Sequence, residues 1–161
     1  MLNAYFLIQE VAMESVRRVR KTDLARNTRQ VISAVLRGQT AFIESHGEPE
    51  AAIIDIADYR ILRATMRYHA RHPSIDLQKG LPDADVTAVS NLEERYDLVI
   101  AHYLSGSISL ARAAQLLDLP SLDLRARFLR LDVPIRTAPI DDAEVWADVD
   151  AARQWGTGTK A

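Results

Sequence analysis

The sequence predicts an α+β protein, in which a small β-α-β-β-α unit precedes an all-α unit and a partly disordered tail. Two apolar runs flank a polar turn within residues 42–54, which indicates a β-hairpin, and apolar residues recur at helical spacing before and after it. Further along, two short helical patterns joined by a tight turn indicate either a helix-turn-helix or an ordinary αα-hairpin. The strands are thus confined to the first part of the chain and the second part is all helical, as in the α+β class.

The first two elements are a short strand over 15–21 and an amphipathic helix behind it. Thr22 is the expected N-cap of this helix, and Gly38 is the expected stop at its C-terminal end. Its apolar positions are Leu24, Thr28, Val31 and Val35, widened by Ala25, Ile32 and Leu36. The opposite positions carry several arginines.

The hairpin turns at His46–Pro49, because Gly47 can adopt positive φ and Pro49 opens the return strand without a backbone donor. The return strand over 51–54 is apolar without alternation, which predicts that both faces of the sheet are covered. A second amphipathic helix, with Tyr59, Leu62 and Met66 on one side, completes the unit near residue 71.

The second half is expected to be helical. A helical pattern over 86–104 is interrupted at residues 105–107, and Ser109 then caps the first helix of the helix-turn-helix. Leu119-Pro120 ends that helix, and Ser121 caps the next one, which runs to about Leu131.

Five segments follow from these patterns. They are an N-terminal extension (1–12), the β-α-β-β-α unit (13–71), a linker (72–86), the helix-turn-helix domain (87–136) and an acidic tail (137–161). Residues from Met13 onward look like a chain start, so 1–12 are either an upstream extension or a helix that packs on the dimer.

Composition narrows the function classes. The 161 residues are 48% hydrophobic and 26% charged, as in a folded domain, and they contain no cysteine, which excludes disulfides and thiolate metal sites. The apolar opening lacks a basic start and is too short to cross a bilayer, so we expect a cytoplasmic protein.

Charge is unevenly distributed, although the formal net charge is only −2. Residues 15–37 contain seven basic side chains against Asp23 alone, whereas residues 137–161 contain five acidic and two basic side chains. A basic head and an acidic tail predict two different partners, one of them polyanionic.

We expect no catalysis, metal or cofactor. His69, His72 and Asp76 lack the defined spacing that a metal site needs, and Pro73 interrupts their helix. The sequence has no Ser-His-Asp arrangement, phosphate-binding loop or dinucleotide glycine pattern.

The segment 19–62 resembles the N-terminal domain of Phd/YefM-type antitoxins, and the likeness extends over about 13–71. The matching positions are Leu24, Ala25, Asn27, Val31, Gly38, His46, Gly47, Pro49, Ala51, Asp58 and Tyr59. One departure is QTAFIE, residues 39–44, where the family has an xPVxI strand.

This resemblance implies a homodimer or a higher homo-oligomer, in which a partner chain buries the second face of the sheet. It also implies operator binding through the strand-helix junction. The positions carried over are Arg20, Lys21, Thr22, Arg26, Asn27 and Arg29. Their chemistry fits, because Arg and Lys neutralise phosphates and Asn can pair with adenine in the major groove.

The segment 92–135 is similar to a little-characterised family of small prokaryotic helix-turn-helix proteins, with the likeness extending over about 88–136. Its members are regarded as antitoxins and are often encoded beside PIN-domain nuclease toxins. The matching positions are Tyr103, Gly106, Ile108, Ser109, Leu110, Ala113, Ala114, Leu116, Leu119 and Pro134. Asp118 and Asp132 replace two family glycines, so this helix-turn-helix could contact DNA, a toxin or the first domain.

The expected function is that of a type II antitoxin, which neutralises a cognate protein toxin and represses its own operon. The acidic tail is the expected toxin-contacting segment. Two alternatives stay open: a stand-alone transcriptional regulator without a toxin, and a protein-protein adaptor that does not bind DNA.

Overall fold

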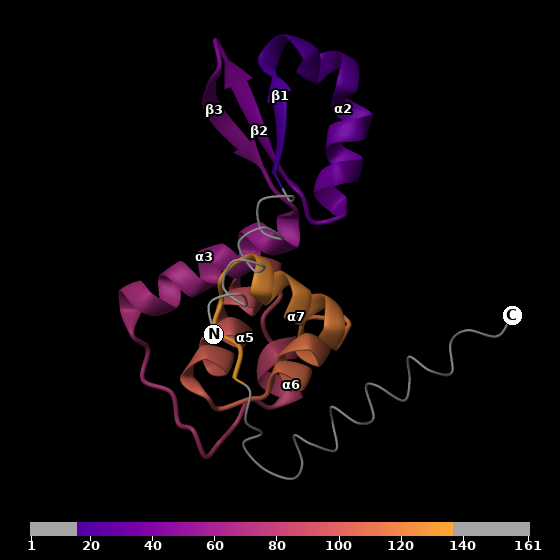
Figure 1. Cartoon of the computed structure of the whole chain (residues 1–161). Helices are drawn as coiled ribbons and strands as arrows, with labels where there is room; N and C mark the ends of the chain where they lie inside the picture. Colours follow the sequence, from indigo (N-terminus) through magenta and orange to yellow (C-terminus); the bar gives the residue numbers. More distant parts are fainter. Residues whose placement is uncertain (1–15, 137–161) are drawn as a thin grey trace, which may run out of the picture. The chain divides into compact units, whose positions relative to one another are not determined.

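The computed structural model describes residues 16–136, which form three strands and six helices and confirm the α+β class (Figure 1). The chain divides into two compact units between Tyr59 and Arg60. The predicted N-terminal extension and the acidic tail lie outside the described residues. Among the described residues, no helix is both long enough and apolar enough to span a bilayer.

The first unit is a three-stranded sheet with one helix packed on it. Its elements are β1 (Val16–Arg20), α2 (Lys21–Leu36), β2 (Thr40–Ser45) and β3 (Glu48–Ile53). The strands lie in the order β1-β2-β3, with β1 parallel and β3 antiparallel to β2. Buried side chains from β1, β2 and α2 form the core of this unit: Val19, Val31, Val35, Ala41 and Ile43.

Helix α2 follows β1 without a connecting loop. Its N-cap position is therefore Arg20, with no side-chain cap, and the prediction that Thr22 caps the helix is wrong. The predicted stop at Gly38 is confirmed, because this residue has φ 92°. The N–H groups of Gly38 and Gln39 bond the carbonyls of Val35 and Ala34, which closes the helix in a Schellman motif.

The hairpin turn is tighter than the sequence indicated. His46 and Gly47 both have positive φ, 53° and 87°, and Ser45 pairs directly with Glu48. A two-residue loop with positive φ at both positions has the geometry that suits the twist of the two strands. In β3 the side chains are exposed apart from the half-buried Ile53, so the described residues leave this strand uncovered.

The second unit is helical. Its helices are α3 (Ile56–Arg71, which begins just before the boundary), α4 (Asp83–Thr87), α5 (Leu92–Ser105), α6 (Leu110–Leu116) and α7 (Ser121–Arg130). The largest fully buried side chains of its core include Ile61, Ile100, Tyr103, Leu124 and Phe128. The rings of Tyr103 and Phe128 pack with their centroids 4.9 Å apart, which holds α5 against α7.

Two segments that the sequence assigned elsewhere contribute to this helical core. Ile61 and Ala64 of α3 are buried in it, although the pattern placed this helix with the strands. Leu81 and Val86, within the expected linker, are buried there too. Arg112 of α6 fixes this stretch through the Leu81 carbonyl at 3.1 Å and the Asp83 carboxylate at 2.7 Å.

The helices of this unit differ in whether a side chain caps their first N–H groups. The Asn91 side chain caps α5 by accepting from the N–H groups of Glu93 and Glu94, and Ser109 caps α6 by accepting from Arg112 N–H. The Ser109 cap was predicted from the sequence and is confirmed. The predicted Ser121 cap is wrong, because Pro120 occupies the N-cap position of α7 and Ser121 already lies inside the helix.

Candidate nucleic-acid interface

The candidate site is the direct junction between β1 and α2. Arg20 is the last residue of the strand, and Lys21 is the first residue of the helix. The unpaired N–H groups of a first helical turn carry partial positive charge and attract anions such as phosphate. The side chain of the N-cap residue Arg20 makes no hydrogen bond to these N–H groups. A bound anion would therefore not compete with a capping side chain.

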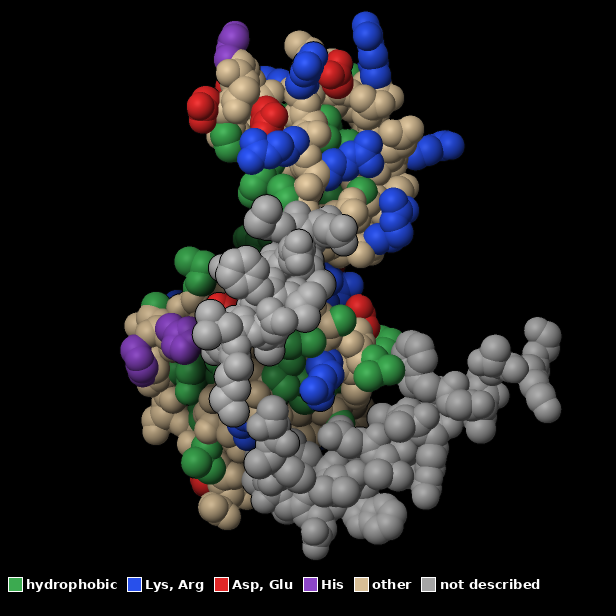
Figure 2. All heavy atoms as spheres, in the orientation of Figure 1, with side chains coloured by type: hydrophobic (Ala, Val, Ile, Leu, Met, Phe, Trp, Pro, Cys, Tyr) green, Lys and Arg blue, Asp and Glu red, His purple; other side chains and the backbone are tan. Residues whose placement is uncertain are grey.

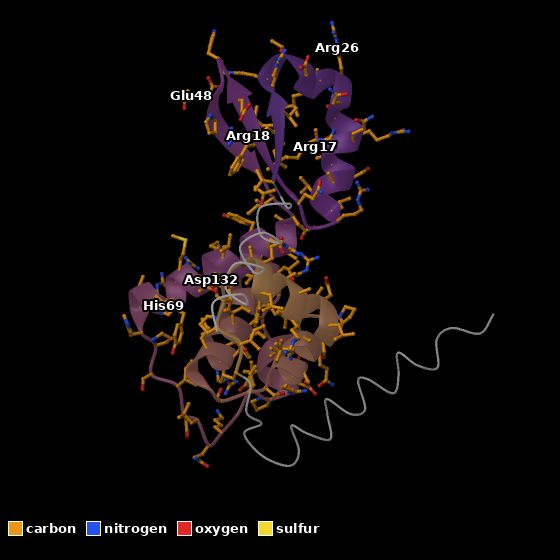
Figure 3. All side chains as sticks on the ribbon, in the orientation of Figure 1. Arg17, Arg18, Arg26, Glu48, His69 and Asp132 are labelled. Carbon is orange, nitrogen blue, oxygen red and sulfur yellow. The ribbon has the colours of Figure 1, made fainter. Side chains whose placement is uncertain are left out.

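Three of the predicted residues share the outer face of α2. At about 100° per residue, Thr22, Arg26 and Arg29 fall on one stripe opposite the buried Val31. All three are exposed, and Arg26 extends away from the helix in Figure 3. Within the described part of the chain neither arginine has a hydrogen bond or an ion pair, so both charges are open to a ligand.

Lys21 is already engaged within the unit. Its Nζ lies 2.9 Å from Oε2 of Glu50 on β3, and both side chains are largely solvent-exposed. The hydrogen bond from Lys21 lowers the pKa of Glu50, with a smaller contribution from Ser45. A phosphate would have to compete with Glu50 for this ammonium group, so the contribution of Lys21 to anion binding is reduced.

Asn27 does not lie with the arginines. It is half-buried, and its helical position is about 100° from Arg26, toward the flank that meets the sheet. The structure therefore divides the six predicted residues by their exposure and pairing. Arg20, Thr22, Arg26 and Arg29 are accessible, Lys21 is paired, and Asn27 is partly covered.

The sheet unit carries further basic residues on β1 and at the end of α2. Figure 2 shows Lys and Arg side chains gathered on the drawn face of the unit that contains the sheet. Arg18 is held by Glu44 at 2.6 Å across the strands, and Arg17 lies 3.4 Å from the Gln30 side chain. Arg37 at the other end of α2 is exposed. Arg37 was absent from the predicted site residues, although its place in the basic run is readable from the sequence.

This arrangement suits contacts with phosphates more than contacts with base edges. Exposed arginines beside an uncapped helix start can bind two or more phosphates at once. Base reading needs donors and acceptors that reach a groove, and the half-buried Asn27 is the weakest part of that prediction.

The residues considered for metal binding do not form a site. His69 lies in the last turn of α3 and His72 follows the helix end with φ 45°. Over residues 16–136, no group of three or more His, Asp or Glu side chains is arranged to hold a metal ion.

Comparisons with protein-family models, with curated proteins and with solved structures found no match to this chain.

Proposed function

We propose that this chain is the antitoxin of a type II toxin-antitoxin system, acting in the cytoplasm without a catalytic site. In this proposal the sheet unit dimerises and binds operator DNA, while later segments bind a cognate protein toxin. The observation that carries the DNA-binding part is the outer face of α2, where Arg26 and Arg29 are exposed and unpaired among the described residues. The toxin-binding part rests on the sequence resemblance to two antitoxin families.

Electrostatics supports DNA as the polyanion. Each phosphate neutralised by a Lys or Arg releases condensed counterions, so affinity for a duplex falls steeply as salt rises. The arginines of the outer face are held on a rigid helix of 16 residues that is fixed to the sheet by buried Val31 and Val35. Rigid presentation lowers the entropy that each contact would otherwise cost.

The test is binding of the full-length protein to duplex DNA from upstream of its own start codon, titrated with salt. We expect sequence-preferring binding. We expect Arg26→Ala, Arg29→Ala to weaken it and to reduce the salt slope by about two, roughly one for each lost phosphate contact.

A matched control removes the same charge elsewhere. Arg71 and Lys79 are exposed residues of the helical unit, and the Arg71→Ala, Lys79→Ala variant should bind DNA as the unchanged protein does. Weak binding that ignores sequence and is equal in all three proteins would contradict the DNA-binding proposal.

The adaptor alternative has one observation in its favour. The outward face of α7, the second helix of the helix-turn-helix, carries Leu122 at 60% exposure and Leu129 at 68%. Leucines cannot form the hydrogen bonds that discriminate base pairs. An adaptor would bind duplex DNA weakly and with a shallow salt slope, which the same titration measures.

A further inference from the structure

The outer face of α7 carries an exposed apolar stripe. Leu122, Ala126 and Leu129 lie one turn apart, opposite the buried Leu124 and Phe128. We call these three residues the α7 stripe. Exposed leucines are ordinary when they are scattered, but two of them with an alanine on one helical face form a surface suited to another apolar helix.

Charge beside the stripe is mainly basic. Arg125 is exposed at its edge and has no ion pair within the described residues. The Asp123 carboxylate forms an ion pair with Arg127, with 3.0 Å between the carboxylate and the Arg127 Nε. An acidic, amphipathic segment would therefore complement the stripe better than a neutral or a basic one.

The described chain ends in contact with α5 and with the residues that follow it. Tyr103 Oη donates to the Pro134 carbonyl at 3.0 Å, and the Arg136 guanidinium lies over the Tyr103 ring at 5.0 Å. Arg136 also donates to the Ile108 carbonyl. These contacts fix the chain to the helical unit six residues after the end of α7 at Arg130.

The sequence beyond Arg136 has the complementary chemistry. Residues 137–161 contain five acidic side chains and two basic ones. Val145, Val149 and Ala152 recur at the same i, i+4, i+7 spacing as the α7 stripe. Helix α7 has 10 residues and is about 15 Å long, a distance that about five extended residues can cover, so the segment can reach back along it.

We propose that the acidic segment 137–161 docks on the α7 stripe of its own chain, with its apolar residues on Leu122 and Leu129 and its acids near Arg125. Helix α7 is then a protein-docking helix and not a base-reading one. This inference deepens the proposed function, because the same segment is the one proposed to contact a toxin, and a toxin would displace it from α7.

The chain offers a direct probe of this docking. Its only tryptophans, Trp146 and Trp155, both lie in the acidic segment, so intrinsic tryptophan fluorescence of the full-length protein reports on that segment alone. We expect emission that is shifted to the blue and protected from acrylamide quenching. We expect Leu122→Ser, Leu129→Ser to weaken docking by about tenfold or more, with red-shifted and readily quenched emission.

Two further variants sharpen the test. Arg125→Glu should release the segment in part, and high salt should weaken docking in the unchanged protein. Met66→Ser, Leu77→Ser removes two similarly exposed apolar side chains, at 72% and 55%, elsewhere in the unit and should leave the emission unchanged. Far-UV circular dichroism checks that each variant is folded.

Three results would overturn the inference: tryptophans fully quenched in the unchanged protein, protection that survives loss of both leucines, or protection lost on dilution. The last would assign the docked segment to a second copy of the chain. The measurement involves neither DNA nor toxin, so its failure is distinguishable from failure of the proposed function.

Discussion

At the scale of single residues, two aspartates occupy positions that favour glycine. Asp118 and Asp132 follow α6 and α7 with φ 55° and 56°, in the left-handed region. In each case the next residue bonds back into the helix, Leu119 N–H to the Ala114 carbonyl at 3.0 Å and Val133 N–H to Phe128 at 2.9 Å. These are Schellman closures, in which glycine is the residue that most readily adopts the left-handed conformation.

Replacing these aspartates by glycine should therefore stabilise the protein. A left-handed conformation costs a residue with a Cβ about 1–2 kcal/mol, less for Asp, and glycine's larger unfolded-state entropy offsets part of the gain. The 3.8 Å contact of Asp118 with Arg95 is solvent-exposed on the aspartate side and adds little. We expect Asp118→Gly and Asp132→Gly each to raise the free energy of unfolding by about 0.5 kcal/mol, measured by urea denaturation.

The control for this prediction is the same substitution at a helical position. Asp85 lies exposed inside α4 and has no positive φ, so Asp85→Gly should lower stability by up to about 1 kcal/mol. Equal destabilisation at all three aspartates would contradict the backbone argument.

At the scale of elements, periodicity predicted where helices form but not what they pack against. The order of strands and helices in residues 16–71 follows the predicted β-α-β-β-α pattern. The apolar side predicted for α3 is wrong, because Tyr59 and Met66 are 47% and 72% exposed. The buried residues Ile61 and Ala64 lie on the other side of the helix and join the core cluster of the helical unit. An apolar face specifies burial alone, and the partner depends on tertiary contacts that spacing does not encode.

Only part of the candidate site could be predicted, because helical periodicity indicates which side chains face solvent but not which residues they pair with. Solvent-facing positions of a long helix follow from its period, so Arg26 and Arg29 are where the sequence indicated. The pairing of Lys21 with Glu50 depends on how β3 lies in the sheet, which no local pattern reveals. Sequence analysis also missed the α7 stripe, although its i, i+4, i+7 spacing was available.

Helix α3 is fixed to α5 by a ladder of partly buried ion pairs. Arg63 lies 2.8 Å from the Asp97 carboxylate, and Arg67 contacts the same oxygen. Glu93 joins the ladder through Arg60 at 2.8 Å and Arg63 at 3.2 Å. Removing one member of such a network leaves charges that are desolvated and uncompensated.

We therefore expect Asp97→Asn to be destabilising. It leaves Arg63 and Arg67 without the anion they share, and the Asp97 side chain is only 20% exposed, so the loss should be about 2 kcal/mol. Thermal unfolding measures it. Glu94→Gln alters an exposed acid in the first turn of the same helix and should change stability by less than about 0.5 kcal/mol. A loss no larger than that of the control would contradict a structural role for the ladder.

At the scale of the whole molecule, the sheet unit has too small a core to be self-sufficient. Its described core cluster contains five buried residues, none of them aromatic. Domains of roughly 40 residues usually need oligomerisation or another source of stability. The sheet face opposite α2 offers apolar surface for that purpose, because Phe42 is half-buried there, Ala52 beside it is exposed, and Val16 is 39% exposed.

We expect this face to form a homodimer interface. Phe42 alternates with the buried Ala41 and Ile43 along β2, so its side chain leaves the core cluster of its own unit and is available to a second copy. Removing an aromatic anchor from an interface costs about 2 kcal/mol, or roughly thirtyfold in Kd. Sedimentation equilibrium should therefore show a dimer for the unchanged protein and a raised Kd for Phe42→Ala.

The same variant links assembly to DNA binding. In the proposed function, a dimer would place two copies of the α2 face on one duplex, and each copy would add its phosphate contacts to a single binding event. Phe42→Ala should thus weaken operator binding although it leaves Arg26 and Arg29 in place, and the loss should shrink as protein concentration rises above the dimer Kd. Met66→Ser changes an exposed apolar residue of the other unit and should affect neither measurement. If the unchanged protein sediments as a monomer yet binds its operator tightly, the α2 face acts alone, and the apolar sheet face must serve a different partner.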